Sequence, residues 1–303
     1  MAKLGWRTTA DEALQGLRLD GRTVVVTGAS SGIGVETVRA LAYAGANVTL
    51  ACRNVALGEE VRKKLESTQP SGAGALQVAE LDLSKPDSVR AFAAAFSTQR
   101  LDLLVNNAGI MATPLGFTAL GIEQQMATNH LGHFLLTQLL RPRLEASRAA
   151  RVVTVASSAH RRGSGASILA TLESDRDFKT RSYRPFTAYG DSKLANILFT
   201  RALAKRLPPQ VLAFSLHPGV IVTHLTRVLG KTIDGLYHLV GVPFTKTAAQ
   251  GAATSVWAAT APELAPQSGA FLKNCALATA KPAGRDDALA ERLWELSAQL
   301  VGA

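Results

Sequence analysis

Tyr189 and Lys193 stand four positions apart in the segment Tyr189-Gly-Asp-Ser-Lys193. On an α-helix, side chains with this spacing lie on one face, with Cβ atoms about 5–6 Å apart. A lysine ammonium at that distance favours the tyrosinate and lowers the tyrosine pKa from its usual value of about 10. Such a pair can exchange a proton with a substrate near neutral pH. Packing and solvated charge alone also place tyrosine and lysine on one helical face, so the surrounding sequence must decide.

A glycine-rich segment, residues 27–34, follows a β-branched run and precedes an apolar periodic segment. Glycines let the backbone turn tightly after a strand and approach a pyrophosphate, whose charge is met by N–H groups at the start of the next helix. The spacing is G-x-x-x-G-x-G, and such a cluster can also be only a tight turn. Its position after the first strand predicts a dinucleotide site. The predicted contacts are Gly28, Ser30, Ser31, Gly32, Ile33 and Gly34.

The choice of cofactor depends on the residues about 20 positions beyond this turn, where an NAD(H) site normally presents a carboxylate to the adenosine ribose. This sequence has Cys52-Arg53-Asn54 there instead. Without a carboxylate to repel it, a 2′-phosphate fits, and the Arg53 guanidinium can bind it through two parallel hydrogen bonds. Arg53 can also be an exposed loop charge, and Ser31 adds no second cation. We predict NADP(H) rather than NAD(H), with Arg53 and Asn54 among its contacts.

Short β-branched runs alternate with longer helical patterns along the chain. The runs are residues 23–27, 47–50, 76–78, 101–105, 151–155 and 211–214. Their continuous apolar character indicates strands buried on both faces, and the intervening segments are long enough for crossover helices. We therefore predict an α/β, doubly wound Rossmann fold with one parallel sheet flanked by helices. No linker or repeat divides the chain, so we expect an N-terminal arm (1–20) and a single NAD(P)-binding domain (21–303).

The composition restricts the class of protein. Of 303 residues, 47% are hydrophobic and 18% are charged, which is typical of a soluble globular protein. No apolar run approaches the ~20 residues that cross a bilayer, and the first residues lack a secretory pattern, so we expect a cytoplasmic protein without a transmembrane segment. Cys52 and Cys275 are the two cysteines, too few for a disulfide framework or a cysteine metal site.

The formal net charge of +10 suggests a nucleic-acid or acidic-membrane partner at first sight. The basic residues, however, occur in twos and threes among apolar segments, without one long stripe or interleaved aromatic residues. We therefore predict no nucleic-acid partner. Attraction of a phosphorylated cofactor is the use of positive charge that fits this distribution better.

The sequence resembles the short-chain dehydrogenase/reductase family over residues 20–275. The resemblance rests on an ordered set of motifs, namely residues 27–34, Asp82, Asn106-Asn-Ala-Gly109, Asn129, Ser157-Ser158, Tyr189-x-x-x-Lys193 and Pro218-Gly219. Within the family, residues 51–54, 129–134, 157–160, 192–199 and 217–219 look like the retinol dehydrogenase branch. Residues 243–251 and 274–275 look most like the oxidoreductase domain of the WW-domain oxidoreductase. An ordered set of this kind is far more specific than any one of its motifs.

The resemblance implies a catalytic tetrad of Asn129, Ser158, Tyr189 and Lys193. Tyr189 would be the general acid and base, and Lys193 would favour its tyrosinate and hold the nicotinamide ribose. Ser158 would donate a hydrogen bond to the developing alkoxide. The 31 residues from Ser158 to Tyr189 exceed the interval in many members because of an insertion at 163–185. Asn129 would hold a water that connects Lys193 to solvent.

The resemblance also implies cofactor contacts outside the glycine turn. They are Asp82 and Leu83 at adenine, Asn106, Ala108 and Gly109 at the adenosine side, Tyr189 and Lys193 at the ribose, Pro218 and Gly219 beside the nicotinamide, and Thr223 at its carboxamide. Single residues have simpler explanations: Asn129 can be a helix N-cap, Ser157 and Ser158 strand-end turn residues, and Asp82 a cap for the helix after Pro86.

His130 and His133 could suggest a metal pair. No third ligand follows at a suitable spacing, so we predict two structural histidines and no metal site.

Residues 223–245 carry apolar side chains at roughly helical intervals with cations between them. We interpret this segment as a lid over a lipophilic substrate. A helix packed on the core, or a segment in peripheral contact with a membrane surface, would show the same pattern.

Together these features predict an NADP(H)-dependent oxidoreductase acting on CH–OH groups. It would interconvert an apolar aldehyde or ketone and its alcohol, a small-molecule substrate, with Tyr189 as general acid and base. The alternative is a non-catalytic dinucleotide-binding sensor or interaction protein on the same fold. The presence of all four tetrad residues favours the enzyme, and the resemblance implies a homo-oligomer.

Overall fold

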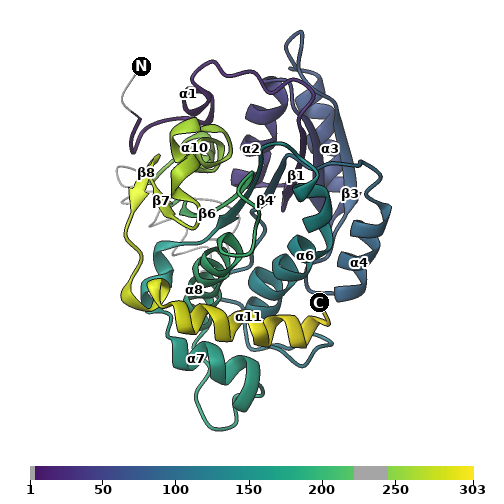
Figure 1. Ribbon diagram of the computed structural model, residues 1–303. Helices are drawn as coiled ribbons and strands as arrows, with labels where there is room; N and C mark the ends of the chain where they lie inside the picture. The colour runs from purple at the N-terminus through teal and green to yellow at the C-terminus, as the bar shows by residue number, and fades with distance from the viewer. Residues whose placement is uncertain (1–3, 222–244) are drawn as a thin grey trace.

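One sheet of eight strands organises the computed structural model, which describes residues 4–221 and 245–303 (Figure 1). Its order is β3-β2-β1-β4-β5-β6-β7-β8. The strands are β1 (Thr23–Thr27), β2 (Asn47–Cys52), β3 (Leu76–Glu80), β4 (Leu103–Asn106), β5 (Ala150–Val155), β6 (Val211–His217), β7 (Phe271–Lys273) and β8 (Ala276–Ala278). The order reverses between β1 and β4, the point at which doubly wound sheets bind ligands.

The sheet confirms the predicted fold class and differs from the prediction at one edge. All six predicted strands are present, in parallel pairings from β3 to β6. Strands β7 and β8 were not predicted, and β8 runs antiparallel to β7. Each has only three residues, too short for an apolar pattern to stand out in the sequence. The sheet is therefore mostly rather than wholly parallel.

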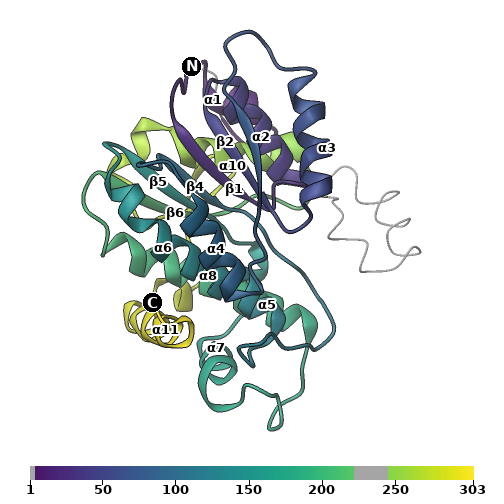
Figure 2. The same ribbon diagram turned by 90° about the vertical axis from the view of Figure 1, so that its right-hand side faces the viewer.

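Helices cover both faces of the sheet (Figures 1 and 2). Their bounds are α1 (Ala10–Leu14), α2 (Gly32–Tyr43), α3 (Val55–Glu66), α4 (Pro86–Ala95), α5 (Gln124–Met126), α6 (Gly132–Glu145), α7 (Gly165–Leu169), α8 (Pro185–Ala204), α10 (Ala248–Thr260) and α11 (Asp287–Val301). In the described residues, no helix is long and apolar enough to cross a membrane.

Alternate residues along each central strand enter two separate cores. Val25 of β1 packs with α4, α6, α8 and α11, whereas its neighbours Val24 and Val26 pack with α1, α2 and α10. A strand buried on both faces needs apolar side chains in both directions, which explains the uninterrupted Val24-Val-Val26 run. This sandwich holds the carboxyl ends of the strands in fixed positions at one edge.

Residues 4–20 lie against this framework. Thr9 caps α1 and forms a reciprocal capping box with Glu12, which accounts for a helix of only five residues. Ala10, Ala13 and Leu14 are buried in the core shared with α10. The Arg39 guanidinium on α2 contacts the Asp11 carboxylate at 2.7 Å.

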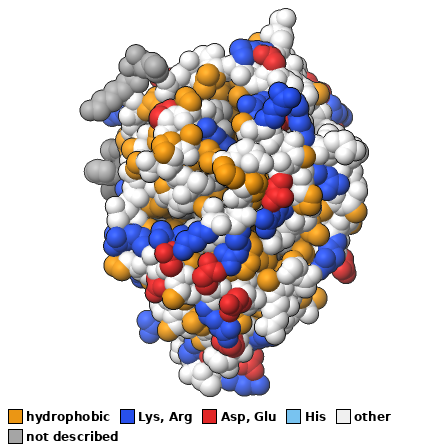
Figure 3. Space-filling view, viewed as in Figure 1, with side chains coloured by type: hydrophobic (Ala, Val, Ile, Leu, Met, Phe, Trp, Pro, Cys, Tyr) orange, Lys and Arg blue, Asp and Glu red, His pale blue; other side chains and the backbone are white. Residues whose placement is uncertain are grey.

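The surface shown in Figure 3 carries Lys and Arg side chains interspersed with Asp and Glu. Ion pairs account for part of this mixture near α11: the Lys205 ammonium lies 2.9 Å from Asp287, and Arg206 pairs with Glu291.

Candidate active site

The glycine turn adopts backbone angles that suit glycine. Gly28 and Gly32 have φ of +64° and +57°, in the left-handed region that other residues rarely enter. A Cβ on Gly28 would also lie 2.8 Å from the Cα of Ala108. Both the conformation and the close approach of the β4 loop therefore require glycine at position 28.

Helix α2 begins directly after this turn, with its amino end uncapped by side chains. Ser31 stands at the N-cap, yet among the described residues its side chain accepts no hydrogen bond from the helix. The first turn of α2 contains no acidic residue. Free N–H groups and the positive end of the helix dipole suit an anionic ligand. The turn thus fits the pyrophosphate of a dinucleotide, as its sequence predicted.

Asn107, rather than Asn106, hydrogen-bonds to the backbone of this turn. The Asn107 amide donates to the carbonyl oxygen of Thr27 at 2.7 Å. Asn106 is fully buried, and its Nδ2 donates to Thr137 Oγ1 on α6 at 3.1 Å. The Asn106 side chain therefore points into the core, and the predicted cofactor contact at this residue stays a prediction. Asn107 belongs to the same motif and was missed.

Tyr189 and Lys193 lie one turn apart on α8, which begins with Pro185 at its first turn. The Lys193 ammonium is 5.7 Å from the centroid of the Tyr189 ring. It donates to the carbonyl oxygen of Val155, at the end of β5, at 2.9 Å. The predicted helical pair is present, and β5 holds its lysine in place.

The pKa of each member is shifted by burial. Burial lowers the pKa of Lys193 to about 8. Burial also raises the pKa of Tyr189, and a hydrogen bond with Ser157 offsets this only in part. The net shift of the Tyr189 pKa is therefore upward, opposite to the expected lowering. Removal from water disfavours the charged form of both groups, so Tyr189 is a neutral phenol at pH 7.

Ser157, not Ser158, faces the Tyr189 hydroxyl. Ser157 is partly buried and hydrogen-bonds with Tyr189. Ser158 is exposed, and its backbone N–H donates to Nδ1 of His217 at 3.2 Å. Ser157 has an extended backbone beyond the end of β5, whereas Ser158 opens a 3₁₀ turn, so the two side chains point in different directions. In this structure Ser157 therefore lies nearer to the tyrosine hydroxyl than Ser158 does, and the predicted role of Ser158 in the tetrad stays a prediction.

Asn129 lies in a π-helical turn, residues Ala127–Leu131, between α5 and α6. It therefore interrupts a helix and is not an N-cap. Its amide donates to the Ile110 carbonyl at 2.9 Å and to Ser192 Oγ at 3.0 Å, while its Oδ1 accepts from Ile110 N–H at 2.8 Å. These bonds fix the fully buried side chain between the β4 loop and the helix of Tyr189 and Lys193.

Gly109 lies beside the side chains of Asn129 and Lys193. A Cβ at Gly109 would lie 3.3 Å from both Asn129 Oδ1 and Lys193 Nζ. The end of the Asn106-Asn-Ala-Gly109 motif thus brings two of the tetrad side chains to one point. Ala108, in the same loop as Gly109, contacts Gly28. The motif therefore reaches from the glycine turn to the tetrad.

Arg53 and Asn54 follow β2 at the same edge of the sheet. Asn54 is the N-cap of α3, and its side chain accepts from Leu57 N–H at 3.0 Å. Arg53 is exposed and forms no hydrogen bond or ion pair with the described residues, although its charge helps to lower the pKa of Asp82. Its guanidinium remains available to an anion at this position.

Asp82 follows β3 and accepts hydrogen bonds from Ser84, including one from its hydroxyl at 2.6 Å. Burial would raise its pKa, but these bonds and the charge of Lys85 lower it overall. Lys85, and not Asp82, occupies the N-cap of α4. The helix-cap alternative for Asp82 is therefore wrong.

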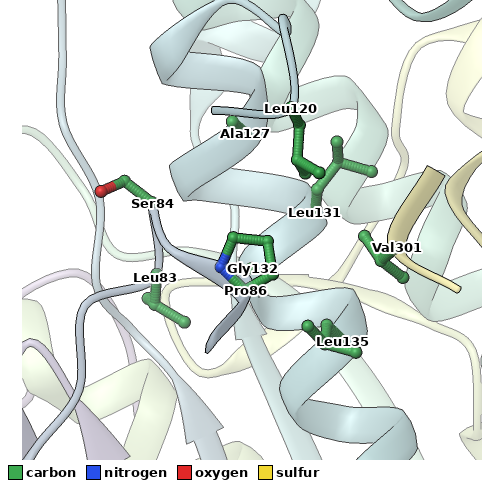
Figure 4. Close-up of a pocket in the computed structure, with 9 residues that line it drawn as sticks. All are labelled: Leu83, Ser84, Pro86, Leu120, Ala127, Leu131, Gly132, Leu135 and Val301. Carbon is green, nitrogen blue, oxygen red and sulfur yellow. The ribbon is translucent and has the colours of Figure 1, made fainter. Parts of the chain in front are cut away.

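The Leu83 side chain points into a small apolar hollow (Figure 4). Leu120, Leu131, Leu135 and Val301 also line this hollow. It lies between the loop after β3, the start of α6 and the carboxyl end of α11. The Leu83 side chain is thus buried in the core, which leaves only its backbone for the predicted cofactor contact.

Pro218 and Gly219 follow β6. Gly219 has φ of +109°, and a Cβ there would lie 2.6 Å from Cδ of Lys246. Glycine is therefore needed for both conformation and space. Thr223 and residues 223–244 of the predicted lid lie outside the described residues.

Asp191, between Tyr189 and Lys193, was not predicted to have a role. It accepts hydrogen bonds from Ser164 N–H at 2.8 Å and from Ser167 Oγ at 2.5 Å. Both serines belong to the insertion at 163–185, which contains α7. Burial raises the pKa of Asp191 to about 6. A buried acid inside the Tyr-x-x-x-Lys motif was the available signal, and it ties the insertion to the catalytic helix.

His130 and His133 each bind protein groups. Nε2 of His130 is 2.8 Å from Ser297 Oγ on α11. Nδ1 of His133 is 2.9 Å from the Asn129 carbonyl oxygen, and its Nε2 is 2.8 Å from Thr27 Oγ1.

Comparison with known proteins identifies the family. A family model described as short chain dehydrogenase matches residues 22–168. Human retinol dehydrogenase 12 is 44% identical over 293 residues, which cover 94% of this chain and 88% of that protein. The chain belongs to the short-chain dehydrogenase family. The WW domain-containing oxidoreductase of Pongo abelii is 40% identical over 97% of this chain and 71% of its own length. This short-chain dehydrogenase therefore lies in the predicted branch.

Solved structures agree with the assignment. A putative uncharacterized protein from Mycobacterium paratuberculosis shares 36% of its sequence with this short-chain dehydrogenase, has a TM-score of 0.76, and aligns over 99% of this chain and 98% of its own. A complex of Pseudomonas aeruginosa RhlG with NADP is 26% identical, with a TM-score of 0.64 over 85% of this chain and 96% of the other. The family comprises nicotinamide-dependent oxidoreductases, and the predicted fold and branch are confirmed.

Proposed function

We propose that this short-chain dehydrogenase uses NADP(H) to interconvert an apolar aldehyde or ketone and its alcohol, with Tyr189 as general acid and base. The observation that carries the proposal is the meeting of Tyr189, Ser157 and Lys193 at the carboxyl edge of the sheet, beside the uncapped amino end of α2. Retinol dehydrogenases and an NADP complex among the relatives support the substrate class and the cofactor.

Bound at the glycine turn, NADPH would supply the hydride. Tyr189 then donates its proton to the substrate oxygen, and the Ser157 hydroxyl donates a hydrogen bond to the same oxygen as negative charge develops there. Lys193 places a cation next to the tyrosine ring and stabilises the tyrosinate that remains. Arg53, unpaired among the described residues, is suited to the adenosine 2′-phosphate.

The raised pKa of Tyr189 distinguishes the two directions of reaction. Reduction needs the phenol, which is the form present at neutral pH. Alcohol oxidation needs the tyrosinate as base, whose fraction grows only as pH rises toward the tyrosine pKa. We therefore expect reduction near neutral pH and an alkaline optimum for oxidation.

The first test measures NADPH oxidation with a panel of apolar and polar aldehydes and ketones. We expect turnover of apolar carbonyl compounds and a higher kcat/KM with NADPH than with NADH. Tyr189→Phe should bind NADPH and lose turnover by about 10²-fold or more, because the proton donor is gone. Activity retained by this variant would overturn the mechanism, and equal use of NADH would overturn the cofactor assignment.

Ser157→Ala and Ser158→Ala form a matched pair, because they remove the same hydroxyl from adjacent positions. We expect Ser157→Ala to lower kcat by roughly 10²-fold, the scale of losing one donor to a developing oxyanion. Ser158→Ala should change kcat less than about threefold, since its side chain is exposed. The reverse order would return the role to Ser158.

The alternative is a non-catalytic dinucleotide-binding sensor on the same fold. It predicts NADPH binding by calorimetry together with no turnover across the panel.

A further inference from the structure

His133 connects two parts of the candidate site that are distant in sequence. It lies on α6 and is fully buried. Its Nδ1 is 2.9 Å from the Asn129 carbonyl oxygen in the π-helical turn. Its Nε2 is 2.8 Å from Thr27 Oγ1, the last residue of β1 before the glycine turn. One imidazole thus connects the π-helical turn that contains Asn129 to the glycine turn after β1.

The hydrogen-bond partners fix the proton on this ring. A carbonyl oxygen only accepts, so Nδ1 must carry the proton that binds Asn129. Thr27 Oγ1 already accepts N–H groups of Asn107 and Ala108, each at 2.9 Å. Its two lone pairs are then used, and its own proton must be donated.

Nε2 of His133 at 2.8 Å is the better acceptor for that proton than the Val105 carbonyl at 3.4 Å. The neutral Nδ1–H tautomer satisfies every one of these contacts. Burial lowers the pKa of His133 to about 4, which keeps the ring neutral at physiological pH.

Thr27 consequently connects three parts of the site: the glycine turn, the loop after β4 and the His133 ring. Its hydroxyl holds the β4 loop through Asn107 and Ala108, and Ala108 contacts Gly28 of the turn. The other end of the His133 ring holds the backbone of Asn129, whose side chain lies between Ile110 and Ser192. A shift of the ring would therefore disturb both the turn and the tetrad.

We propose that His133 is a positioning residue that couples the glycine turn to the Asn129–Lys193 pair, through Nε2 to Thr27 and through Nδ1–H to the Asn129 carbonyl. This inference rests on the proposed function for its kinetic consequences, whereas the hydrogen-bond pattern stands on the geometry alone.

The first measurement uses the cofactor-free wild-type chain and is independent of activity. Nitrogen NMR of ¹⁵N-histidine-labelled protein reports the tautomer of each ring, and His133→Asn identifies the signal by its loss. We expect a protonated Nδ1, an unprotonated Nε2 and no titration between about pH 5 and 8. A protonated Nε2, or a ring that titrates in this range, would overturn the proposal.

Two variants separate the two ends of the ring. The amide nitrogen of asparagine replaces Nδ1, so His133→Asn keeps a donor for Asn129 and loses the acceptor for Thr27. The oxygen of glutamine reaches the position of Nε2, so His133→Gln keeps that acceptor and loses the donor. We expect His133→Asn to raise the NADPH Kd about tenfold with kcat within about twofold. We expect His133→Gln to lower kcat about tenfold with a nearly unchanged Kd.

A proportional loss of kcat and NADPH affinity in both variants, or no loss in either, would reduce His133 to an ordinary core residue. Should a variant not fold, Thr27→Val against Thr27→Ser tests the same connection from the other side. Only the valine variant should raise the NADPH Kd and shift the Nε2 signal of His133. Failure of the proposed function would look different, because the wild type would lack turnover while the tautomer remained as expected.

Discussion

Burial lowers the pKa of Lys193 and also lowers the stability of the folded protein at neutral pH. The residue is 3% exposed, and its ammonium has a pKa of about 8, against 10.5 for the free side chain. Between these two values the unfolded chain binds more protons than the folded chain, so this group makes the protein more stable as pH rises from 8 to 10.5. At pH 7 the buried charge costs about 3 kcal/mol relative to water.

Lys193→Met should therefore raise the free energy of unfolding at pH 7 while abolishing turnover. The gain should shrink as pH rises toward 10, because the wild-type lysine then loses its charge. The Val155 carbonyl keeps a donor in the variant, since Asn196 Nδ2 lies 3.3 Å from it. Urea unfolding of both proteins at pH 7 and 9.5 measures the difference, with exposed Lys64→Met as control. A variant less stable than the wild type at pH 7 contradicts this account of Lys193.

The sequence alone does not distinguish two adjacent identical residues of which only one faces the site. Asn106 ends β4 and Asn107 follows it, whereas Ser157 and Ser158 come after β5, with Ser157 extended and Ser158 opening a 3₁₀ turn. In each pair the two side chains point in different directions, so one enters the core or solvent and the other the site. Motif and spacing locate the pair, but the choice within it depends on a register of one residue that only the packed sheet determines.

At the scale of elements, the insertion before α8 depends on Asp191. Its carboxylate holds Ser164 and Ser167 of α7, and Arg181 donates to the Ser167 hydroxyl at 2.8 Å. The insertion thus adds a segment whose anchor stands within the catalytic motif itself. Sequence patterns had assigned this segment no secondary structure, because α7 is only five residues long and is stabilised by these tertiary contacts.

Asp191→Ala should loosen this insertion, because Ser164 N–H and the Ser167 hydroxyl lose their acceptor. We expect trypsin to cleave the basic stretch at residues 176–184 several times faster than in the wild type. Asp191→Asn retains an acceptor of the same shape and should be cleaved at nearly the wild-type rate. Mass spectrometry of the first fragments identifies the sites. Equal cleavage of both variants and the wild type would show that Asp191 does not anchor the segment.

The long parallel strands were predictable for a physical reason that does not extend to every element. A strand such as β1 is buried on both faces and must be apolar throughout, which leaves a visible pattern. The π-helical turn at Asn129 has no such pattern, because its backbone is set by contacts with Ile110 and Ser192. Motifs therefore place Tyr189 and Lys193, which share one regular helix, more sharply than the serine, and the catalytic roles of all of them stay predictions.

At the scale of the whole molecule, a net charge of +10 attracts polyanions over distances beyond direct contact. NADPH carries one more phosphate than NADH, so its association should depend more strongly on salt. We expect the KM for NADPH to rise more steeply than that for NADH between about 0.05 and 0.5 M NaCl, as screening shortens the reach of the field. Initial rates with both cofactors measure this. Identical salt dependence for the two cofactors would show that long-range electrostatic attraction contributes nothing to the preference for NADPH.

The expected homo-oligomer stays a prediction.

Contacts between segments far apart in the chain have a consequence for its biosynthesis. The carbonyl of Arg7 accepts from Gln250, and α1 buries Ala10 and Leu14 against α10. Trp294 of α11 likewise packs against Phe134 of α6 in the middle of the chain, with ring centroids 4.9 Å apart. A nascent chain leaving the ribosome therefore holds α1 and α6 without their partners until α10 and α11 have been made. Because such distant contacts delay folding, this apolar surface stays accessible to chaperones until then.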